Sequence, residues 1–413
     1  MRTFAAVLLL AAAAAPLFAG PSGAEREEYV LRTWKKIRVT DKFYAEGANV
    51  GDFNRDGKMD IVAGPYWIEG PDFTKTHLFM AEEKAYDPAA YSKNFFAYTW
   101  DVNKDGWTDI IIYGFPGEDV SWYENPQGKE GPWIRHKVID KLDNESPQFV
   151  DVNGDGIPDV VGSTDGKLGY WTISDWKFHP ISPKGGYQRF THGLGVGDVN
   201  GDGRMDILEA NGWWEQPKSL EGDPEWTLHK EKFGKGGAQM YAYDVNGDGL
   251  PDVITSIEAH GLGLSWFEQL KEGGFKEHVI LGRKDEDNKY GVRFSQMHAI
   301  DLVDMDGDGL KDIVTGKRYW AHGAHGDVDP GAPAVLYWFK LVRGKDGSVD
   351  WIPFKIDDDS GVGTQVIAAD LNGDKYPDVV VSNKKGIFVH IGEVKKVSRE
   401  EYEKQLPKPA DGR

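Results

Sequence analysis

Cysteine is missing from this chain of 413 residues, so disulfide bonds cannot stabilise it and no cysteine can carry a lipid anchor. Basic side chains are fewer than acidic ones: the chain has 48 Lys and Arg and 67 Asp and Glu, which gives a net charge of −19. Nucleic acids and anionic membranes attract Lys and Arg, so this charge disfavours both as partners and favours bound cations. Beyond the N-terminal segment no apolar run reaches 18 residues, which disfavours membrane insertion there.

The N-terminal segment has the features of a secretory signal. Residues 1–24 contain an early Arg2, an apolar run from Phe4, and the small residues Ser22 and Ala24 before a cleavage point. A membrane anchor is the alternative, but the apolar run is short for one. We therefore expect a soluble protein that is exported to the periplasm or secreted.

The sequence is rich in glycine, proline and tryptophan, with 51, 21 and 15 residues respectively. This composition indicates many short strands and turns, and the hydrophobic content of 40% is enough for a large core.

An acidic nonapeptide occurs seven times along the chain. Its copies are DFNRDGKMD (52–60), DVNKDGWTD (101–109), DVNGDGIPD (151–159), DVNGDGRMD (198–206), DVNGDGLPD (244–252), DMDGDGLKD (304–312) and DLNGDKYPD (370–378). The copies resemble an EF-hand calcium loop, but only the fourth has Glu, Glu209, at the twelfth position, which argues against EF-hands. Successive copies start 49, 50, 47, 46, 60 and 66 residues apart, about the length of a four-stranded propeller blade.

The ends of the repeat array complement each other. The segment TWKKIRVTD (33–41) matches the outermost strand PWIRHKVID (132–140), whereas only two strands follow the seventh nonapeptide. We therefore predict an all-β fold over residues 30–396, a seven-bladed β-propeller of four-stranded antiparallel blades whose last blade is closed by the N-terminal strand. Residues 397–413 are a charged tail, expected to form a short helix followed by a disordered end.

These repeats resemble the FG-GAP/VCBS family of calcium-binding β-propellers. The resemblance implies structural calcium in up to seven loops, held by a backbone carbonyl at the seventh loop position and by side chains at positions one, three, five and nine. Crowded carboxylates and oxygen-only ligands also favour calcium on physical grounds, with solvated, metal-free turns as the alternative. The implied side-chain ligands are Asp52, Asn54, Asp56, Asp60, Asp101, Asn103, Asp105, Asp109, Asp151, Asn153, Asp155, Asp159, Asp198, Asn200, Asp202, Asp206, Asp244, Asn246, Asp248, Asp252, Asp304, Asp306, Asp308, Asp312, Asp370, Asn372, Asp374 and Asp378. The seventh copy has Lys375 where the turn needs glycine, so we expect a strained or differently shaped loop.

Two classes of histidine can be separated by their place in the repeat. One class recurs in the outermost strands, which indicates a structural role, and comprises His77, His136, His179, His229 and His278. His192 and His298 instead lie six residues before the first Asp of their loops, and Glu46 and Glu145 occupy the same position in other repeats. Equivalent positions in a propeller are related by rotation about the channel, so these four side chains should meet at its mouth.

The loops on the face opposite the acidic loops supply further functional candidates. Aromatic rings with mixed donors and acceptors suit a carbohydrate, and the candidate substrate-binding residues are Tyr66, Trp67, Arg189, Trp213, Trp214, His260, Arg293 and His322. Packing between blades is the alternative role for each Trp.

Two longer segments, RFTHGLGVGDVNGDGRMDILEANGWWEQP and FSQMHAIDLVDMDGDGLKDIVTGKRYWAHG, are similar to the propeller of aldos-2-ulose dehydratase and its bacterial relatives. This resemblance implies a lyase or dehydratase that acts on a sugar or keto-sugar. Elimination next to a carbonyl needs a base, a group that stabilises the enolate and an acid.

We assign His298 or His192 as the base, or as ligands of one catalytic divalent metal that Glu145 or Glu46 completes. Lys317, Arg318 and Tyr319 are expected to hold the oxyanion or donate the proton. The alternative is a non-catalytic propeller that binds glycans or proteins. A hydrolase has little support, because neither G-x-S-x-G nor H-E-x-x-H occurs.

Overall fold

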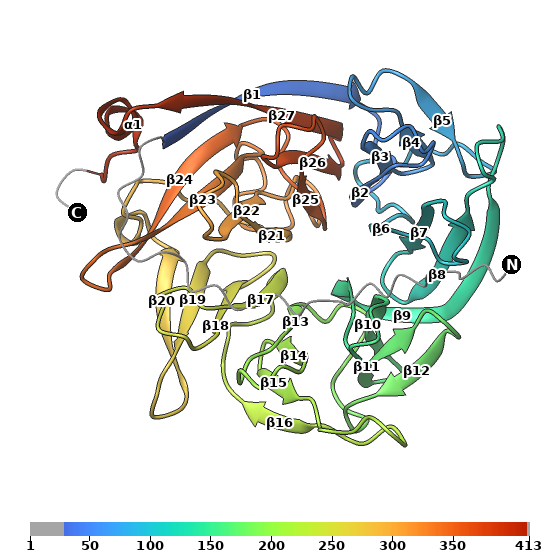
Figure 1. The fold of residues 1–413 in the computed structure, drawn as a ribbon, viewed down its shortest axis with the longest axis horizontal. Helices are drawn as coiled ribbons and strands as arrows, with labels where there is room; N and C mark the ends of the chain where they lie inside the picture. Colours follow the sequence, from blue (N-terminus) through green and yellow to red (C-terminus); the bar gives the residue numbers. More distant parts are fainter. Residues whose placement is uncertain (1–28, 411–413) are drawn as a thin grey trace, which may run out of the picture.

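The computed structural model describes residues 29–410, so the predicted signal at residues 1–24 lies outside the described part of the chain. The strands form a ring of radially arranged sheets around a common centre (Figure 1). Each repeat has four antiparallel strands, the last completed by β1, and the innermost strand of each lies nearest the centre of the ring.

The strands of each rank have the following bounds. The innermost strands are β2 (Ala48–Gly51), β6 (Phe96–Trp100), the second half of β9 (Ile134–Val150), β13 (Leu194–Gly197), β17 (Gln239–Tyr243), β21 (Ile300–Val303) and β25 (Val366–Ala369). The second strands are β3 (Asp60–Ala63), β7 (Asp109–Tyr113), β10 (Asp159–Thr164), β14 (Asp206–Glu209), β18 (Asp252–Ser256), β22 (Asp312–Gly316) and β26 (Asp378–Asn383). The third strands are β4 (Tyr66–Ile68), β8 (Glu118–Glu124), β11 (Lys167–Thr172), β15 (Gly212–Glu215), β19 (Leu264–Gln269), β23 (Leu336–Arg343) and β27 (Gly386–Val397). The outermost strands are β5 (Thr76–Leu78), the first half of β9, β12 (Lys177–Pro180), β16 (Thr227–Lys230), β20 (Phe275–Leu281), β24 (Val349–Asp357) and β1 (Tyr29–Thr40).

Hydrogen bonding joins some repeats into larger sheets. The long strand β9 belongs to two repeats and makes a seven-stranded sheet from β6 to β12. Strands β13 and β17 pair in parallel at Leu194 with Gln239, which makes an eight-stranded sheet. Three other sheets have four strands each.

The N-terminal strand β1 pairs with β27 from Tyr29 opposite Val397 to Thr40 opposite Ile387. The sequence predicts this pairing, and it covers the outer edge of β27 with a strand from the other end of the chain.

The second strand of each repeat is buried because sheets pack on both of its faces. Apolar side chains from neighbouring sheets meet there, and one such cluster includes Phe53, Val62, Trp67, Ile110 and Trp133. Side-chain amides also connect the innermost strands, since Gln239 Nε2 donates to the Thr364 carbonyl and Gln365 Nε2 donates to the Ala97 carbonyl. The ring around the channel is therefore held by both apolar packing and hydrogen bonds.

The charged tail begins with the predicted short helix, α1 (Arg399–Gln405), after the 3-10 helix η1 (Asp285–Asp287) earlier in the chain. Tyr402 stacks on Tyr29 with ring centroids 5.0 Å apart. The prediction of a disordered end is wrong as far as Ala410, whose backbone N donates to the Lys289 carbonyl at 2.8 Å. No helix among residues 29–410 has both the length and the apolar character that crossing a bilayer requires.

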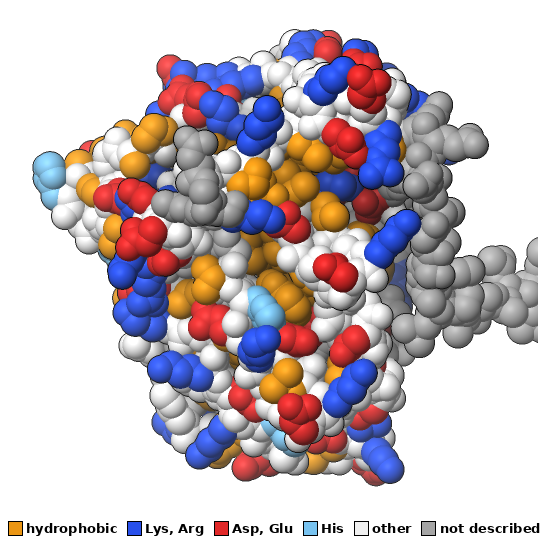
Figure 2. All heavy atoms as spheres, turned by 90° about the vertical axis from the view of Figure 1, so that its left-hand side faces the viewer, with side chains coloured by type: hydrophobic (Ala, Val, Ile, Leu, Met, Phe, Trp, Pro, Cys, Tyr) orange, Lys and Arg blue, Asp and Glu red, His pale blue; other side chains and the backbone are white. Residues whose placement is uncertain are grey.

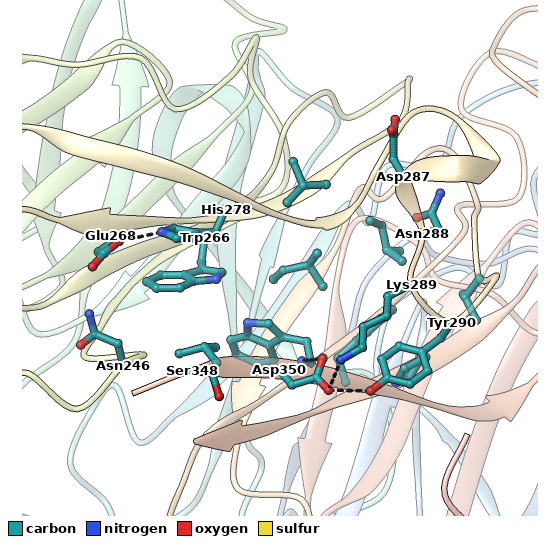
Figure 3. Close-up of a pocket in the computed structure, with 18 of the residues that line it drawn as sticks. Asn246, Trp266, Glu268, His278, Asp287, Asn288, Lys289, Tyr290, Ser348 and Asp350 are labelled. Carbon is teal, nitrogen blue, oxygen red and sulfur yellow. Dashed lines mark hydrogen bonds and ion pairs between the residues drawn. The ribbon is translucent and has the colours of Figure 1, made fainter. Parts of the chain in front are cut away.

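The side of the ring that carries α1, β20 and β24 has charges of both signs around a hollow lined by hydrophobic side chains (Figure 2). A pocket of about 400 Å³ lies between β20 and β24 (Figure 3). On one wall, His278 stacks on Trp266 with centroids 4.3 Å apart and its Nε2 lies 2.7 Å from Glu268 Oε2. On the other wall, Lys289 Nζ donates to Asp350 Oδ2 at 2.7 Å.

The stacked pair in this pocket is a feature of the repeat. His77, His136, His179, His229 and His278 stack on Trp67, Trp122, Tyr170, Trp213 and Trp266, with ring centroids 3.9 to 5.0 Å apart. This stacking agrees with the structural role predicted for these histidines, and we interpret the pocket as a seam between repeats.

Candidate functional site

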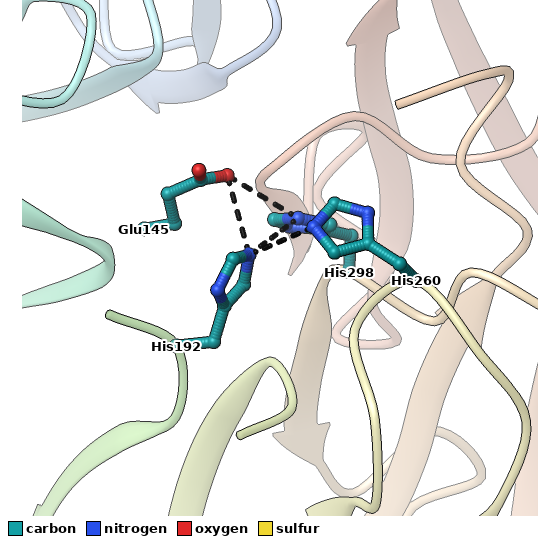
Figure 4. A group of neighbouring side chains, drawn as sticks. All are labelled: Glu145, His192, His260 and His298. Atoms are coloured by element: carbon teal, nitrogen blue, oxygen red, sulfur yellow. Dashed lines mark hydrogen bonds and ion pairs between the residues drawn. The ribbon is translucent and has the colours of Figure 1, made fainter. Parts of the chain in front are cut away.

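Four side chains from different repeats meet in one cluster, which we call the histidine cluster: Glu145, His192, His260 and His298 (Figure 4). Glu145 lies within β9, and His192 and His298 each lie two residues before an innermost strand. His260 comes from the loop between β18 and β19. The predicted meeting of Glu145, His192 and His298 is confirmed.

The nitrogen and oxygen atoms of the cluster face one another. His192 Nε2 lies 3.2 Å from His298 Nε2 and 3.1 Å from His260 Nε2. Glu145 Oε2 lies 3.4 Å from the Nε2 atoms of both His192 and His298. The four atoms lie within 4.8 Å of one another.

A hydrogen bond fixes the tautomer of His192, and burial keeps His298 neutral. The His192 Nδ1–H donates to the Phe190 carbonyl at 2.8 Å, which leaves Nε2 of a neutral ring with a lone pair directed at the cluster. Burial lowers the pKa of His298 to about 3, helped by the positive charge of Arg318. Burial alone would raise the pKa of Glu145, but hydrogen bonds with His192 and His298 outweigh it and hold that pKa well below its usual range.

This donor set fits a divalent transition metal. Nitrogens about 2.0 to 2.1 Å from a tetrahedral zinc are about 3.3 Å apart, close to the spacing of the imidazoles here. Neutral imidazoles and a carboxylate suit zinc, iron, nickel or copper better than calcium. His192, His260, His298 and Glu145 are therefore the residues that would hold such an ion.

A buried ion pair lies beside the cluster. Arg318 pairs with Glu46, and both side chains are almost fully buried, with 2% and 1% exposed. Arg318 Nη1 also lies 3.8 Å from Glu145 Oε2. Glu46 thus reaches the cluster through Arg318 and not by direct contact, which refines the prediction that it converges there.

A second acidic group lies on the other side of His260. Asp327 Oδ1 is 3.6 Å from His260 Nδ1 and 2.7 Å from His322 Nδ1. The His322 backbone N also donates to Asp327 Oδ2 at 2.7 Å, which fixes the carboxylate. Asp327 can therefore orient the imidazole of His322, which is half-exposed at the rim of the cluster, and it lies near His260 without a hydrogen bond to it.

Aromatic rings and a lysine complete the surroundings. Phe190, next to the His192 hydrogen bond, is 45% exposed and packs edge-on against Phe115, whose ring is 5.2 Å from Tyr91. Lys384 Nζ lies 4.6 Å from the Tyr91 ring centroid, and burial lowers the pKa of Lys384 to about 8. Arg318 lies over Phe95, at 5.6 Å.

Two predicted catalytic residues have other surroundings. Lys317 is fully buried and its Nζ donates to Ser295 Oγ at 3.3 Å, and burial lowers its pKa to about 8. Tyr319 stacks on Trp320 with centroids 4.8 Å apart and lies under Lys385. Of the three residues expected to hold an oxyanion, the structure brings only Arg318 to the cluster.

The predicted aromatic platforms belong mainly to the packing of the sheets. Trp67 and Trp213 are buried under their stacked histidines. Trp214 is also buried and its indole N–H donates to the Tyr187 hydroxyl. Tyr66 packs edge-on against Tyr44 with centroids 5.4 Å apart. Packing, the alternative that the sequence left open, accounts for these rings.

The two predicted arginines also lie apart from the cluster, whereas His260 belongs to it and His322 lies at its rim. Arg293 pairs with the exposed Asp285 at 2.6 Å, and Arg189 lies over the Phe190 ring at 5.8 Å. His260 and His322 were expected to bind substrate, and the structure places His260 among the possible metal ligands. Sequence reasoning assigned no role to Asp327, Lys384, Tyr91 or Phe190, although Phe190 and Asp327 lie within the loops that it indicated.

The acidic loops share one hydrogen-bonding plan, seen clearly in the fourth. Asp198 accepts hydrogen bonds from the backbone N atoms of Asp202 and Gly203, at 3.0 and 2.8 Å. Asp206, at the ninth position, is buried and accepts from the backbone N atoms of Val199 and Gln216, both at 2.9 Å. The ninth residue therefore connects the start of its own loop to the end of the third strand.

The ninth-position carboxylates are costly to ionise. Burial raises the pKa of Asp60, Asp206 and Asp378 to about 6, and that of Asp109, Asp159 and Asp252 to about 7. In the seventh loop Lys375 has φ +74°, the left-handed conformation that glycine adopts in the others, so the expected strain is present.

A repeat-family model and two known proteins are similar to this chain or to parts of it. The FG-GAP-like repeat family matches residues 101–162, 151–209 and 244–315. The chain is 29% identical over 195 residues to protein linkin of Caenorhabditis elegans, an alignment that covers 39% of this chain and 30% of linkin. The chain thus spans less than a third of the length of that relative.

Among solved structures, the chain is similar to BBS1N, crystallised in complex with ARL6DN and soaked with lead. The identity is 7% and the TM-score 0.48, over 89% of this chain and 98% of that chain. The predicted resemblance to the FG-GAP/VCBS family is supported as far as the presence of FG-GAP-like repeats. Calcium binding and the likeness to aldos-2-ulose dehydratase stay predictions. The chain carries FG-GAP-like repeats, in three matched places, in a β-propeller.

Proposed function

We propose that this protein is an exported, metal-dependent lyase that removes water from a sugar or keto-sugar at the histidine cluster. The observation that carries the proposal is the convergence of three imidazole Nε2 atoms and one carboxylate oxygen from four repeats. Packing alone gives no reason to direct these polar atoms at one point. The resemblance of two segments to the propeller of aldos-2-ulose dehydratase suggests the reaction class.

The groups around the cluster can supply the base, the enolate-stabilising charge and the acid that an elimination needs. A divalent metal held by these residues with one coordination position open to the substrate would draw electron density from a substrate carbonyl and so acidify the adjacent C–H bond. His322, oriented by Asp327, would accept that proton, and the positive charge of Arg318 would help to stabilise the resulting enolate. Lys384 would donate a proton to the hydroxyl that leaves as water.

A sugar ring also needs an apolar surface. Phe190 and Phe115 supply one beside His192, in place of the buried tryptophans that the sequence suggested. The faces of sugar rings are apolar and their rims carry hydroxyls, so aromatic rings next to charged groups suit such a ligand.

The proposal also concerns the propeller fold on which the site lies. We infer a ring of seven blades, with structural calcium in the acidic loops on the face opposite the histidine cluster. The crowding of carboxylates within each acidic loop supports a nearby cation, because such crowding is destabilising at neutral pH without one.

A non-catalytic propeller that binds a glycan or a protein is the second candidate. The burial of Trp67, Trp213 and Trp214 favours it, because fewer aromatic rings are available to hold a sugar than the sequence predicts.

A direct assay follows the ultraviolet absorbance of the conjugated product on keto-sugars with wild type, His298→Ala and His136→Ala. We expect His298→Ala to lose at least about 100-fold in kcat/KM, because it removes a ligand, and His136→Ala to retain activity because that histidine stacks on Trp122. Equal activity in the two variants would contradict the assigned site, and wild type that turns over no keto-sugar would favour the binding function.

A further inference from the structure

The sixth acidic loop, residues 304–312, differs from the other six at its third position. Every other loop has asparagine there, at 54, 103, 153, 200, 246 and 372, whereas the sixth has Asp306. The carboxylates of Asp304, Asp306 and Asp308 lie within 4.8 Å of one another. This loop therefore carries one more carboxylate than each of its relatives.

The third strand of the same repeat carries a compensating change. In four other repeats an aromatic residue on this strand is followed two positions later by a glutamate that lies 2.7 to 2.9 Å from the outermost-strand histidine: Glu69, Glu124, Glu215 and Glu268. In β23 the equivalent residue after Trp338 is Lys340, and Phe354 replaces the histidine in the register. Phe354 stacks on Trp338 as the histidines stack elsewhere, with centroids 4.6 Å apart.

This strand position faces the acidic loop. In the second repeat, Asn103 Nδ2 at the third loop position donates to Glu124 Oε1 at 3.4 Å. In the sixth repeat, Lys340 Nζ contacts Asp306 Oδ2 and donates to Asp308 Oδ2 at 2.6 Å. Lys340 is 6% exposed and Asp306 is 3% exposed, so the pair is shielded from water.

Lys340 and two of the loop's own amides contact different oxygens of Asp306 and Asp308. The backbone N atoms of Asp308 and Leu310 donate to the Oδ1 atoms of Asp306 and Asp308, at 3.2 and 2.9 Å. The ammonium of Lys340 lies at the Oδ2 atoms of both carboxylates, so it holds the two side chains together as a bound cation would.

We propose that Lys340 is the built-in cation of the sixth loop and makes this loop independent of calcium. The ammonium balances the additional carboxylate of Asp306 and takes the oxygens that an ion would need. Breaking the buried pair would leave uncompensated carboxylates, so the loop would then require an external cation. The contrast with the other loops rests on the proposed calcium binding, but the role of Lys340 in holding the loop does not.

Hydrogen exchange measured by mass spectrometry tests the proposal on the full chain, in calcium and in EDTA. In wild type, we expect peptides that cover 304–312 to exchange equally in both buffers, while the other acidic loops exchange faster in EDTA. In Lys340→Met, exchange at 304–312 should rise at least about tenfold in EDTA and recover in calcium. The matched control is Lys311→Gln, an exposed lysine of the same loop, which should behave as wild type.

A second variant tests the same proposal if Lys340→Met does not fold. Asp306→Asn with Lys340→Glu gives the sixth loop the residues of its relatives, and we expect it to bind one more calcium ion per chain than wild type. Calcium-dependent exchange at 304–312 in wild type would overturn the proposal, and so would unchanged exchange in Lys340→Met. If no loop responds to calcium, the proposed calcium binding fails, and faster exchange in Lys340→Met in both buffers would still support the role of Lys340.

Discussion

The carboxylate of Glu145 lies between two imidazoles and a guanidinium, and these neighbours come from two other repeats: His192 from the fourth, and His298 and Arg318 from the sixth. Such an arrangement concentrates charge in a buried space, where every missing partner is costly. Two predictions at the scale of single residues follow from burial of this kind.

Arg318→Met should be strongly destabilising. Glu46, 1% exposed, would lose its cation and leave a buried carboxylate without a partner. We expect the free energy of unfolding, measured by chemical denaturation, to fall by about 3 to 5 kcal/mol. Arg135→Met breaks an exposed pair with Asp119 and should cost less than about 1 kcal/mol. Similar losses in the two variants would contradict the buried pair.

His390 should make stability depend on pH. It is fully buried with Nε2 3.0 Å from Ser360 Oγ, and burial lowers its pKa from 6.5 to about 4. The unfolded chain therefore binds a proton at a higher pH than the folded chain does. The stability that the neutral imidazole contributes is complete above pH 6.5 and is lost as pH falls from 6.5 to 4, by at most about 3 kcal/mol.

The measurement compares wild type with His390→Phe, which cannot titrate, by denaturation between pH 4 and 7.5. The wild-type advantage should shrink as the pH falls. His325→Gln, which changes an exposed histidine, serves as the control. A difference between wild type and His390→Phe that stays constant with pH would contradict the assignment.

At the scale of structural elements, the repeat is what makes the site predictable. The offset of six residues before each acidic loop is enough to predict from the sequence that Glu145, His192 and His298 lie together. The same reasoning assigns no role to Asp327 and assigns His260 to substrate binding and not to this cluster, because loops between second and third strands differ in length and have no common offset. Aromatic side chains are also misjudged, since a tryptophan in a short strand has the same sequence pattern whether it packs on a histidine or faces a ligand.

The pairing of β1 with β27 predicts the effect of shortening the chain. A protein that starts at residue 41 loses the strand Tyr29–Thr40 and exposes the edge of β27, whereas one that starts at residue 29 keeps it. We expect the shorter chain to melt lower by roughly 10 °C or more and to self-associate. Thermal melting and light scattering would show this, and equal behaviour of the two chains would contradict the role of β1.

At the scale of the whole molecule, the ring brings together residues that are far apart in sequence. Arg318 and Glu46 are separated by 272 residues, and Lys384 and Tyr91 come from opposite ends of the chain. The sequence could predict the all-β repeat fold and the pairing of its ends because each repeat carries its own signal. It could not predict the rim of the channel, where single side chains such as Lys384 have no equivalent in other repeats.

The central claim is that the histidine cluster binds a transition metal, and elemental analysis tests it most directly. Wild type, His298→Ala and His136→Ala would be incubated with zinc, freed of loosely bound ions and analysed, with anomalous scattering to locate the ion. We predict about one tightly bound metal per chain in wild type and His136→Ala, at the cluster, and less than about a tenth of that in His298→Ala. A wild-type chain that holds no transition metal, or the same content in His298→Ala, would contradict the account.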